Sequence, residues 1–170
     1  MTTIQEYFSK IWRPSTEKFK HSGWRLLGKV SPGESVLDVG CGYNLFKPYL
    51  ENQLHGIDPY NICADEQVSI EDFVTDKKFD VIFCLGSINF GSEDVILKQV
   101  EKVCSLCKPN TRIYWRQNPG QKDHQWPECQ DIDFYAWSFE KNLEFAKKFG
   151  CKVEMLAWDE NRIYAEWIKL

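Results

Sequence analysis

Apolar positions follow two different periods along this chain. Runs in which nearly every residue is apolar are typical of buried parallel strands, whereas apolar residues three and four positions apart are typical of amphipathic helices. The first pattern predicts strands at residues 35–39, 55–58, 69–73, 79–85, 111–115, 151–158 and 162–169. The second pattern predicts one or two helices within residues 3–30, interrupted near residue 14, and further helices at residues 45–53, 92–107 and 139–149.

Capping and turn residues support several of these boundaries. Ser92 precedes two acidic residues and is typical of a helix start, while Gly150 is typical of a helix end. Pro48 is compatible with a helix only in its first turn. The alternation of strands and helices predicts a mostly parallel seven-stranded α/β sheet with helices on both faces, completed by a C-terminal antiparallel hairpin.

We expect a single domain over residues 1–170, with residues 1–30 as an N-terminal helical lid and residues 31–170 as the core. In open sheets of this kind, ligands bind beyond the carboxyl ends of the parallel strands. The loops that should meet there follow Val39, Asp58, Leu85 and Trp115. The pattern therefore predicts one pocket at this edge of the sheet.

Composition narrows the possible classes of protein. The chain has 170 residues, of which 43% are hydrophobic and 27% charged, so it can bury a substantial core and is not a disordered or collagen-like chain. A formal net charge of −4 disfavours a globally basic nucleic-acid binder. Aromatic residues make up 15% and include seven Trp, which can fill a core or line a ligand site.

The cysteines indicate a reducing compartment. Seven are present at irregular spacing, and the N-terminal residues lack the apolar stretch of a secretory signal, so a cytoplasmic location is expected. Cys104 and Cys107 form a C-x-x-C, but the sequence has no second such pair and only three His. We therefore expect no metal site, and both thiols are expected to pack on a helix. No apolar run is long enough for a membrane helix.

A glycine-rich segment after the first strand carries the clearest chemical signal. Asp38 precedes the G-x-G formed by Gly40 and Gly42, and Asp58 ends the next strand, where a carboxylate can bind ribose hydroxyls. A dinucleotide-binding loop would have Gly at Leu45, and a phosphate-binding loop would have Lys after the second glycine. The loop therefore favours a nucleoside that carries a cation, with Asp38 near its ammonium or sulfonium group.

VLDVGCGYN, the acid in GIDPYN, FDVIFCLGSINF and WSFEKNLEFAKKFGCKVE resemble the Rossmann-like class I S-adenosylmethionine-dependent methyltransferases. The resemblance covers residues 25–170. It implies a doubly wound fold and S-adenosylmethionine as cofactor. It also implies which residues bind the cofactor. Asp38, Gly40 and Gly42, with Cys41 between the glycines, would bind the methionine end, Asp58 the ribose, and Pro59 would flank the adenine. Ile70 and Glu71 would lie at the adenine edge, and Leu85 and Gly86 would close the pocket near the sulfonium. Asn44 stands where the family usually has Gly, and Asn tolerates positive φ.

The resemblance does not specify a catalytic residue, because methyl transfer from a sulfonium mainly requires a positioned acceptor. The weak candidates are Asp123, His124, Asn89 and Tyr135, with Glu128 in the same loop as the first two. For His124, a surface histidine is the simpler interpretation. Asn118 begins an N-P-G that follows the wrong strand for the N-P-P-Y motif of amino-group methyltransferases.

Aromatic and basic residues of the N-terminal segment raise the question of the acceptor. Four Trp are expected on the acceptor side, and three in strands are expected in the core; these are Trp12, Trp24, Trp126 and Trp137, and Trp115, Trp158 and Trp167. Residues 1–30 hold six Lys or Arg and two Glu, a net charge of +4, against −8 for the remaining chain. This asymmetry fits either an anionic substrate or a solvated helix face.

The sequence predicts methyl transfer from S-adenosylmethionine to an unidentified acceptor, with a small molecule favoured because the loops are short. Two alternatives stay open: a catalytically inactive S-adenosylmethionine-binding partner or regulatory protein, and a nucleic-acid methyltransferase. Salt-dependent RNA or DNA binding would distinguish the last alternative.

Overall fold

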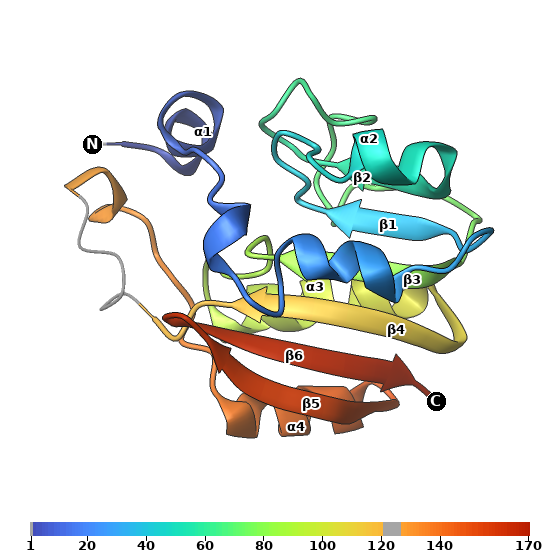
Figure 1. Cartoon of the computed structure of the whole chain (residues 1–170). Helices are drawn as coiled ribbons and strands as arrows, with labels where there is room; N and C mark the ends of the chain where they lie inside the picture. Colours follow the sequence, from blue (N-terminus) through green and yellow to red (C-terminus); the bar gives the residue numbers. More distant parts are fainter. Residues whose placement is uncertain (1, 121–126) are drawn as a thin grey trace.

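Six strands form one sheet in the computed structural model, which describes residues 2–120 and 127–170, in the order β2-β1-β3-β4-β6-β5 (Figure 1). The strands are β1 (Val36–Val39), β2 (Leu54–Ile57), β3 (Phe79–Leu85), β4 (Cys107–Gln117), β5 (Cys151–Asp159) and β6 (Arg162–Lys169). β1 pairs in parallel with β2 and β3, and β3 pairs in parallel with β4. β6 runs antiparallel to both β4 and β5. The mostly parallel α/β sheet and its closing hairpin are confirmed.

The expected seventh strand at residues 69–73 is wrong. The Phe73 amide donates to the Ser69 carbonyl at 3.0 Å, which closes a turn, and the Asp72 amide donates to Ser69 Oγ. On the side of β2 that faces away from β1, the described residues form only an isolated bridge, between Ile57 and Glu66. A serine hydroxyl that bonds to a nearby amide competes with strand pairing, which explains why the apolar residues here did not extend the sheet.

Alternate residues of the central strands face two different hydrophobic clusters, as the predicted layers require. On β3, Ile82 and Cys84 pack with α3 (Glu93–Ser105) and α4 (Phe139–Lys148), while Val81 and Phe83 pack on the opposite face. That second face is covered by α2 (Lys47–Leu50) and by the 3-10 helix η3 (Trp24–Lys29). Helices therefore cover both faces.

The helix boundaries follow local signals closely, except in one case. Ser92 and Ser138 are the N-cap residues of α3 and α4, although only Ser138 accepts a side-chain capping bond. Pro48 lies in the first turn of α2, as expected. The helix expected at residues 45–53 is shorter, because α2 ends at Leu50 and Glu51 takes a positive φ of 48° before a single 3-10 turn.

Of the one or two amphipathic helices expected within residues 3–30, the first is confirmed over residues 4–11, which end before the expected interruption near residue 14, whereas the remainder forms only short 3-10 turns. This segment contains α1 (Ile4–Glu6), the π-turn η1 (Tyr7–Ile11) and the 3-10 turns η2 (Thr16–Lys18) and η3. Asp159, at the end of β5, accepts hydrogen bonds of 2.7–3.0 Å from three consecutive backbone amides and 2.8 Å from Ser22 Oγ; the amides are those of Lys20, His21 and Ser22. Three amides aimed at one carboxylate cannot also donate along a helix, so a tertiary contact overrides the helical spacing.

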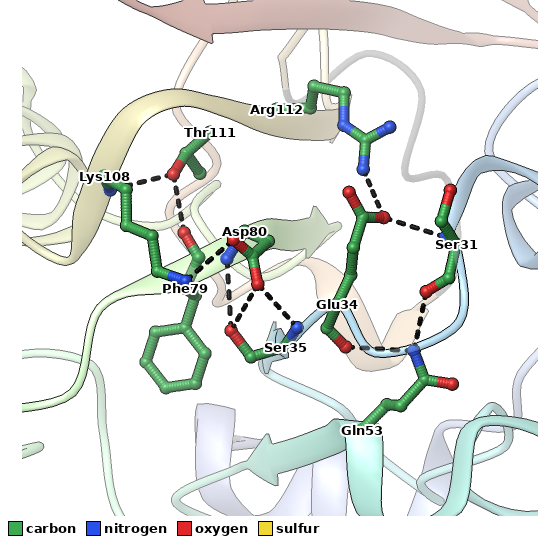
Figure 2. Close-up of polar contacts among 9 residues, drawn as sticks. All are labelled: Ser31, Glu34, Ser35, Gln53, Phe79, Asp80, Lys108, Thr111 and Arg112. Atoms are coloured by element: carbon green, nitrogen blue, oxygen red, sulfur yellow. Dashed lines mark hydrogen bonds and ion pairs between the residues drawn. The ribbon is translucent and has the colours of Figure 1, made fainter.

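The two ends of the sheet carry different features. α1, at the start of the N-terminal segment, lies beyond the carboxyl end of β1, at the left of the molecule (Figure 1). The opposite end carries a polar network in which Asp80 accepts bonds from Ser35 and Lys108, while Glu34 pairs with Arg112 (Figure 2). This network fixes the start of β1 against β3 and β4, away from the end where a ligand is expected.

The cysteines and one tryptophan are placed differently from the sequence expectation. Cys104 packs on α3, but Cys107 begins β4, so the C-x-x-C bridges two elements. Trp115 and Trp167 are in the core, whereas Trp158 on the edge strand is 59% exposed, which corrects its expected core position. Within the described residues there is no cluster of His, Cys, Asp and Glu placed to hold a metal ion. In the same residues, every helix is too short or too polar to cross a membrane.

Candidate functional site

A cavity of about 1100 Å³ lies where the loops after the parallel strands meet. Each of the four loops named from the sequence contributes to its wall, as Gly40, Pro59, Gly86 and Asn118 show. The structure therefore brings together segments that lie up to 78 positions apart in the sequence. Of the ten residues expected to bind a cofactor, eight line this cavity: Gly40, Gly42, Asp58, Pro59, Ile70, Glu71, Leu85 and Gly86.

The glycine-rich loop depends on the absence of side chains. Gly40 has φ +69°, and a Cβ there would lie 2.2 Å from the Ser87 Cβ. Gly42 has φ +55°, and its Cβ would meet the Trp12 ring at 2.8 Å. Asn44 takes φ 57°, the left-handed conformation that its amide side chain was expected to tolerate. The loop thus turns sharply between β1 and the packed residues of two other segments.

Asp38, the last but one residue of β1, is a buried acid without a hydrogen-bond partner among the described residues. Burial is the main reason why the pKa of its carboxyl is raised to about 7; Arg116 opposes the increase, and Asp58 and Asp65 add to it. Asp38 and Cys41 line a hollow of about 50 Å³ that shares Gly40 and Leu85 with the large cavity. A buried, unpaired carboxyl of this kind is suited to a cation.

Asp58 lines the cavity and also accepts hydrogen bonds from the protein backbone. Its Oδ2 accepts the Gly42 amide at 2.9 Å, and its Oδ1 accepts the Tyr60 and Asn61 amides at 2.8 and 2.9 Å. The carboxylate therefore ties the glycine-rich loop to the segment after β2. An ionised carboxylate offers about four acceptor positions, which leaves room for about one ligand hydroxyl rather than the expected pair.

The part of the cavity beyond Asp58 contains a second unsatisfied group. Ile70 and Glu71 line this wall from a turn rather than from the expected strand. Gln99, from α3, donates its Nε2 to Glu71 Oε1 at 2.5 Å, and its own Oε1 is buried without a partner. A flat polar ring placed here would find acceptor oxygens from two elements.

The candidate catalytic residues separate into three groups. Asn89 lines the cavity, and its Oδ1 accepts the Asn118 amide at 2.9 Å. Tyr135 is not among the lining residues, and its hydroxyl donates to Glu93 on α3 at 2.7 Å. Asp123 and His124 lie outside the described residues. Glu128, from the same loop, does line the cavity.

The tryptophans expected on the acceptor side are likewise divided. Trp12 lines the cavity and stacks on Tyr43 with a ring separation of 5.9 Å. Trp24 packs against Phe46 and Tyr49, on the sheet face that α2 and η3 cover. Trp137 is buried, and its indole nitrogen donates to the Ile88 carbonyl. Both expectations are therefore wrong, while Trp126 lies outside the described residues. Sequence position alone did not show whether each Trp ring would line the cavity or pack in the core.

No protein-family model and no curated protein sequence matches the chain. Solved structures do. The methyltransferase bound to the Trm112 methyltransferase activator of Haloferax volcanii is 15% identical, with a TM-score of 0.68 over 89% of this chain and 90% of that chain. Magnesium protoporphyrin IX methyltransferase from Synechocystis, with bound S-adenosylmethionine, is 12% identical, with a TM-score of 0.68 over 98% and 95%. The N-methyltransferase NodS from Bradyrhizobium japonicum, with S-adenosylhomocysteine, is 13% identical, with a TM-score of 0.65 over 90% and 94%. The chain has the class I methyltransferase fold.

Sequence reasoning missed several residues that line this cavity. Phe8 lies 5.3 Å from Phe90 and 6.4 Å from Tyr60, measured between ring centroids, so the N-terminal segment touches the loops after β2 and β3. Arg116 lines the same cavity from the end of β4. A signal existed for Arg116, since a charged residue in an apolar strand of a buried sheet requires an explanation. Nothing in the sequence indicated a role for Phe8, because its contacts with Tyr60 and Phe90 form only when the chain is folded.

Proposed function

We propose that this protein binds S-adenosylmethionine and transfers its methyl group to a small molecule. The observation that carries the proposal is Asp38, a buried carboxyl without a partner in the part of the chain that is described, beside a glycine-rich loop. Burying an unpaired ionisable group is costly, so a site that keeps one is suited to a ligand of opposite charge. Titration with the cofactor tests this directly.

Three further features of the described residues support the fit of this cofactor. Ser87 Oγ and Gln99 Oε1 are buried polar atoms without partners, and each lies in the wall of the cavity. Gly40 and Gly42 leave backbone exposed where side chains would not fit. Asp38 would bind the ammonium of the methionine end, Asp58 one ribose hydroxyl, and Glu71 with Gln99 the edge of the adenine.

S-adenosylmethionine supplies a methyl group on a sulfonium, which is already a good leaving group. The chain then has to orient an acceptor and exclude water. Phe8 and Trp12 cover the cavity from the N-terminal segment, and Asn89 offers an amide at its wall. A small-molecule acceptor is supported by this cover, because residues 4–12 pack over the loops that a large substrate would need to approach.

Calorimetric titration of the full chain with S-adenosylmethionine is the first test, with Asp38→Asn as the variant. We expect the wild type to bind and Asp38→Asn to bind at least tenfold more weakly. Asp80→Asn, a matched change at the opposite end of the sheet, should leave the affinity unchanged. If millimolar cofactor produces neither heat nor a thermal shift in the wild type, the proposal is wrong.

Transfer of a radiolabelled methyl group separates an enzyme from a binder. Metabolite extracts, RNA and protein are offered in turn, and label is expected in the metabolite fraction. Label in RNA or DNA would support the nucleic-acid alternative. Cofactor binding without transfer to any fraction would support the regulatory alternative.

A further inference from the structure

The charges around the cavity are separated by sign. Three acids line it from β2 and the following segment, the part assigned above to the nucleoside: Asp58, Glu71 and Asp72. Three cations line it from the N-terminal segment and the end of β4: Arg13, Lys18 and Arg116. The basic character of the first 30 residues is therefore partly directed at the cavity, and is not only that of a solvated face.

These three cations have no carboxylate within 4.0 Å in the described part of the chain. Arg116 Nη1 and Nη2 donate to the backbone carbonyls of Ser22 and Leu85, and Arg13 Nη1 donates to carbonyls and to Tyr43 Oη. These acceptors are neutral. The positive charges of Arg13 and Lys18 are therefore oriented by the protein without close ion pairs. Arg116 has no carboxylate within ion-pair distance either, although Asp159 and Asp38 act on it from further away and raise its pKa against the larger effect of burial.

Two of these cations lie against the same ring, that of Phe19. Arg116 Cζ lies 4.1 Å from the ring centroid of Phe19, and Lys18 Nζ lies 5.0 Å from it. Two like charges that share one ring repel each other, and an anion between or beside them would relieve that repulsion. The arrangement is thus more favourable with a bound anion than without one.

Two other charged residues line the cavity, with opposite signs. Glu128 and Arg162 both act on the Tyr7 phenol, Glu128 raising its pKa and Arg162 lowering it, after the larger effect of burial. Arg162 also lowers the pKa of Arg116, so it adds to the positive charge near that residue. The methionine carboxylate of the cofactor would balance one of the three cations, which leaves two for a second anion.

Aromatic rings form another part of the cavity wall. Phe90 lies between Phe8 and Phe134, with centroid separations of 5.3 Å to each. Asn89, which comes directly before Phe90 in the chain, also lines the cavity. Its Nδ2 donates no hydrogen bond to the described residues. A flat ring can pack against such a wall while a polar substituent reaches the amide.

Building on the proposed function, we infer that the methyl acceptor is a small aromatic anion, whose carboxylate or phosphate lies against Lys18 and Arg116 and whose ring packs against Phe8 and Phe90. The positive charges of Lys18 and Arg116 favour an anionic ligand, and the rings of Phe8 and Phe90 pack against its aromatic part. A neutral or cationic aromatic compound of the same size should bind more weakly, since it leaves the two cations unbalanced.

The test measures binding of simple probes to the full chain saturated with S-adenosylhomocysteine. Benzoate and phenyl phosphate are the anionic rings, benzamide and benzylamine are the neutral and cationic rings, and acetate is the anion without a ring. We expect benzoate and phenyl phosphate to bind at least tenfold more tightly than the other three. Lys18→Gln and Arg116→Gln should each weaken benzoate at least fivefold and leave benzamide unchanged.

Matched controls separate this effect from general charge. Lys98→Gln changes an exposed lysine of α3, and Arg112→Gln changes an arginine on the same strand as Arg116, at the opposite end of the sheet; neither lines the cavity. Neither should alter benzoate affinity. The inference is overturned if benzamide or benzylamine binds as tightly as benzoate, or if Lys18→Gln, an exposed site that will not affect folding, leaves benzoate affinity unchanged.

The cofactor proposal fails separately. If S-adenosylhomocysteine does not bind, the proposed function is wrong, and the same probes are then measured on the ligand-free protein. Charge selection that depends on Lys18 would still support the anion site there, and its absence would refute that site as well.

Discussion

Replacing Asp38 with Asn removes a buried charge while keeping the shape of the side chain, and it should stabilise the protein. Burial raises the pKa of this carboxyl from 3.8 to about 7. Between pH 4 and pH 7 the native state therefore holds a proton that the unfolded state has released, so wild-type stability falls as the pH rises through this range. The shift corresponds to at most about 4 kcal/mol.

The expected signature is a stability difference that depends on pH. Asp38→Asn should match the wild type near pH 4, gain about 1.4 kcal/mol for each pH unit above it, and level off above pH 7. Urea unfolding followed by circular dichroism at pH 4, 5.5, 7 and 8 measures this difference. A variant that is no more stable than the wild type at pH 8, or equally stabilised at pH 4 and pH 8, would refute the reasoning.

Asp80 provides a control of opposite sign in the neighbouring strand. Its carboxylate accepts bonds from Lys108 and Ser35, which lower its pKa from 3.8 to about 2 (Figure 2). A lowered pKa means that Asp80 contributes stability above pH 4, and that this contribution is lost as the pH falls towards 2. Because the side chain is partly exposed, Asp80→Asn should cost only about 1–2 kcal/mol at pH 7.

The cofactor should narrow the stability difference between the two proteins. At a concentration one hundred times its Kd for the wild type, a ligand that binds only the folded state adds about 2.7 kcal/mol. Wild-type protein should gain this amount from S-adenosylmethionine, while Asp38→Asn, which is expected to bind at least tenfold more weakly, should gain at most about 1.4 kcal/mol. Equal gains for both proteins would show that Asp38 does not contribute to the binding site.

Three further substitutions test other parts of the structure. Asn142→Ala should destabilise the protein by about 2–3 kcal/mol in urea unfolding, because the buried Asn142 bonds to Gln117 and to the Trp167 indole, whose polar groups would be left unpaired. Asp159→Asn should cost about 1–2 kcal/mol at pH 7, and the loss should shrink as the pH falls below 4, since backbone bonds to the segment at Ser22 lower the pKa of Asp159. Trp12→Ala should leave urea unfolding unchanged within about 1 kcal/mol and weaken S-adenosylhomocysteine about two- to tenfold by calorimetry, because this ring covers Gly42; unchanged affinity would contradict its place over the site.

Local sequence signals predicted most of the sheet. The apolar runs at β1, β3, β5 and β6 and the spacing of α3 and α4 correspond closely to the structure, because a strand or helix that buries one face needs that periodicity wherever it lies. The glycines and Asp38 were also recognised, since backbone conformation and a strand-terminal acid are local properties.

The sequence was misleading where a tertiary contact outweighs local preference. Residues 20–22 carry helical spacing, but the Asp159 carboxylate takes their amides. Residues 69–73 are strand-like in composition, but Ser69 closes a turn. In both cases one hydrogen-bonding group competes with the backbone pairing that periodicity assumes, and a window of neighbouring residues does not contain that group.

The sequence by itself determined the order of the strands and helices, the glycine-rich turn and the acids that follow β1 and β2. The tertiary structure decided which side chains meet around the cavity. Arg116 and Lys18 are 98 positions apart and share the ring of Phe19, and Phe8 reaches Phe90 from the other end of the N-terminal segment. Periodicity records which residues are buried, whereas the unbalanced charge and aromatic wall depend on distances that exist only after the sheet has formed.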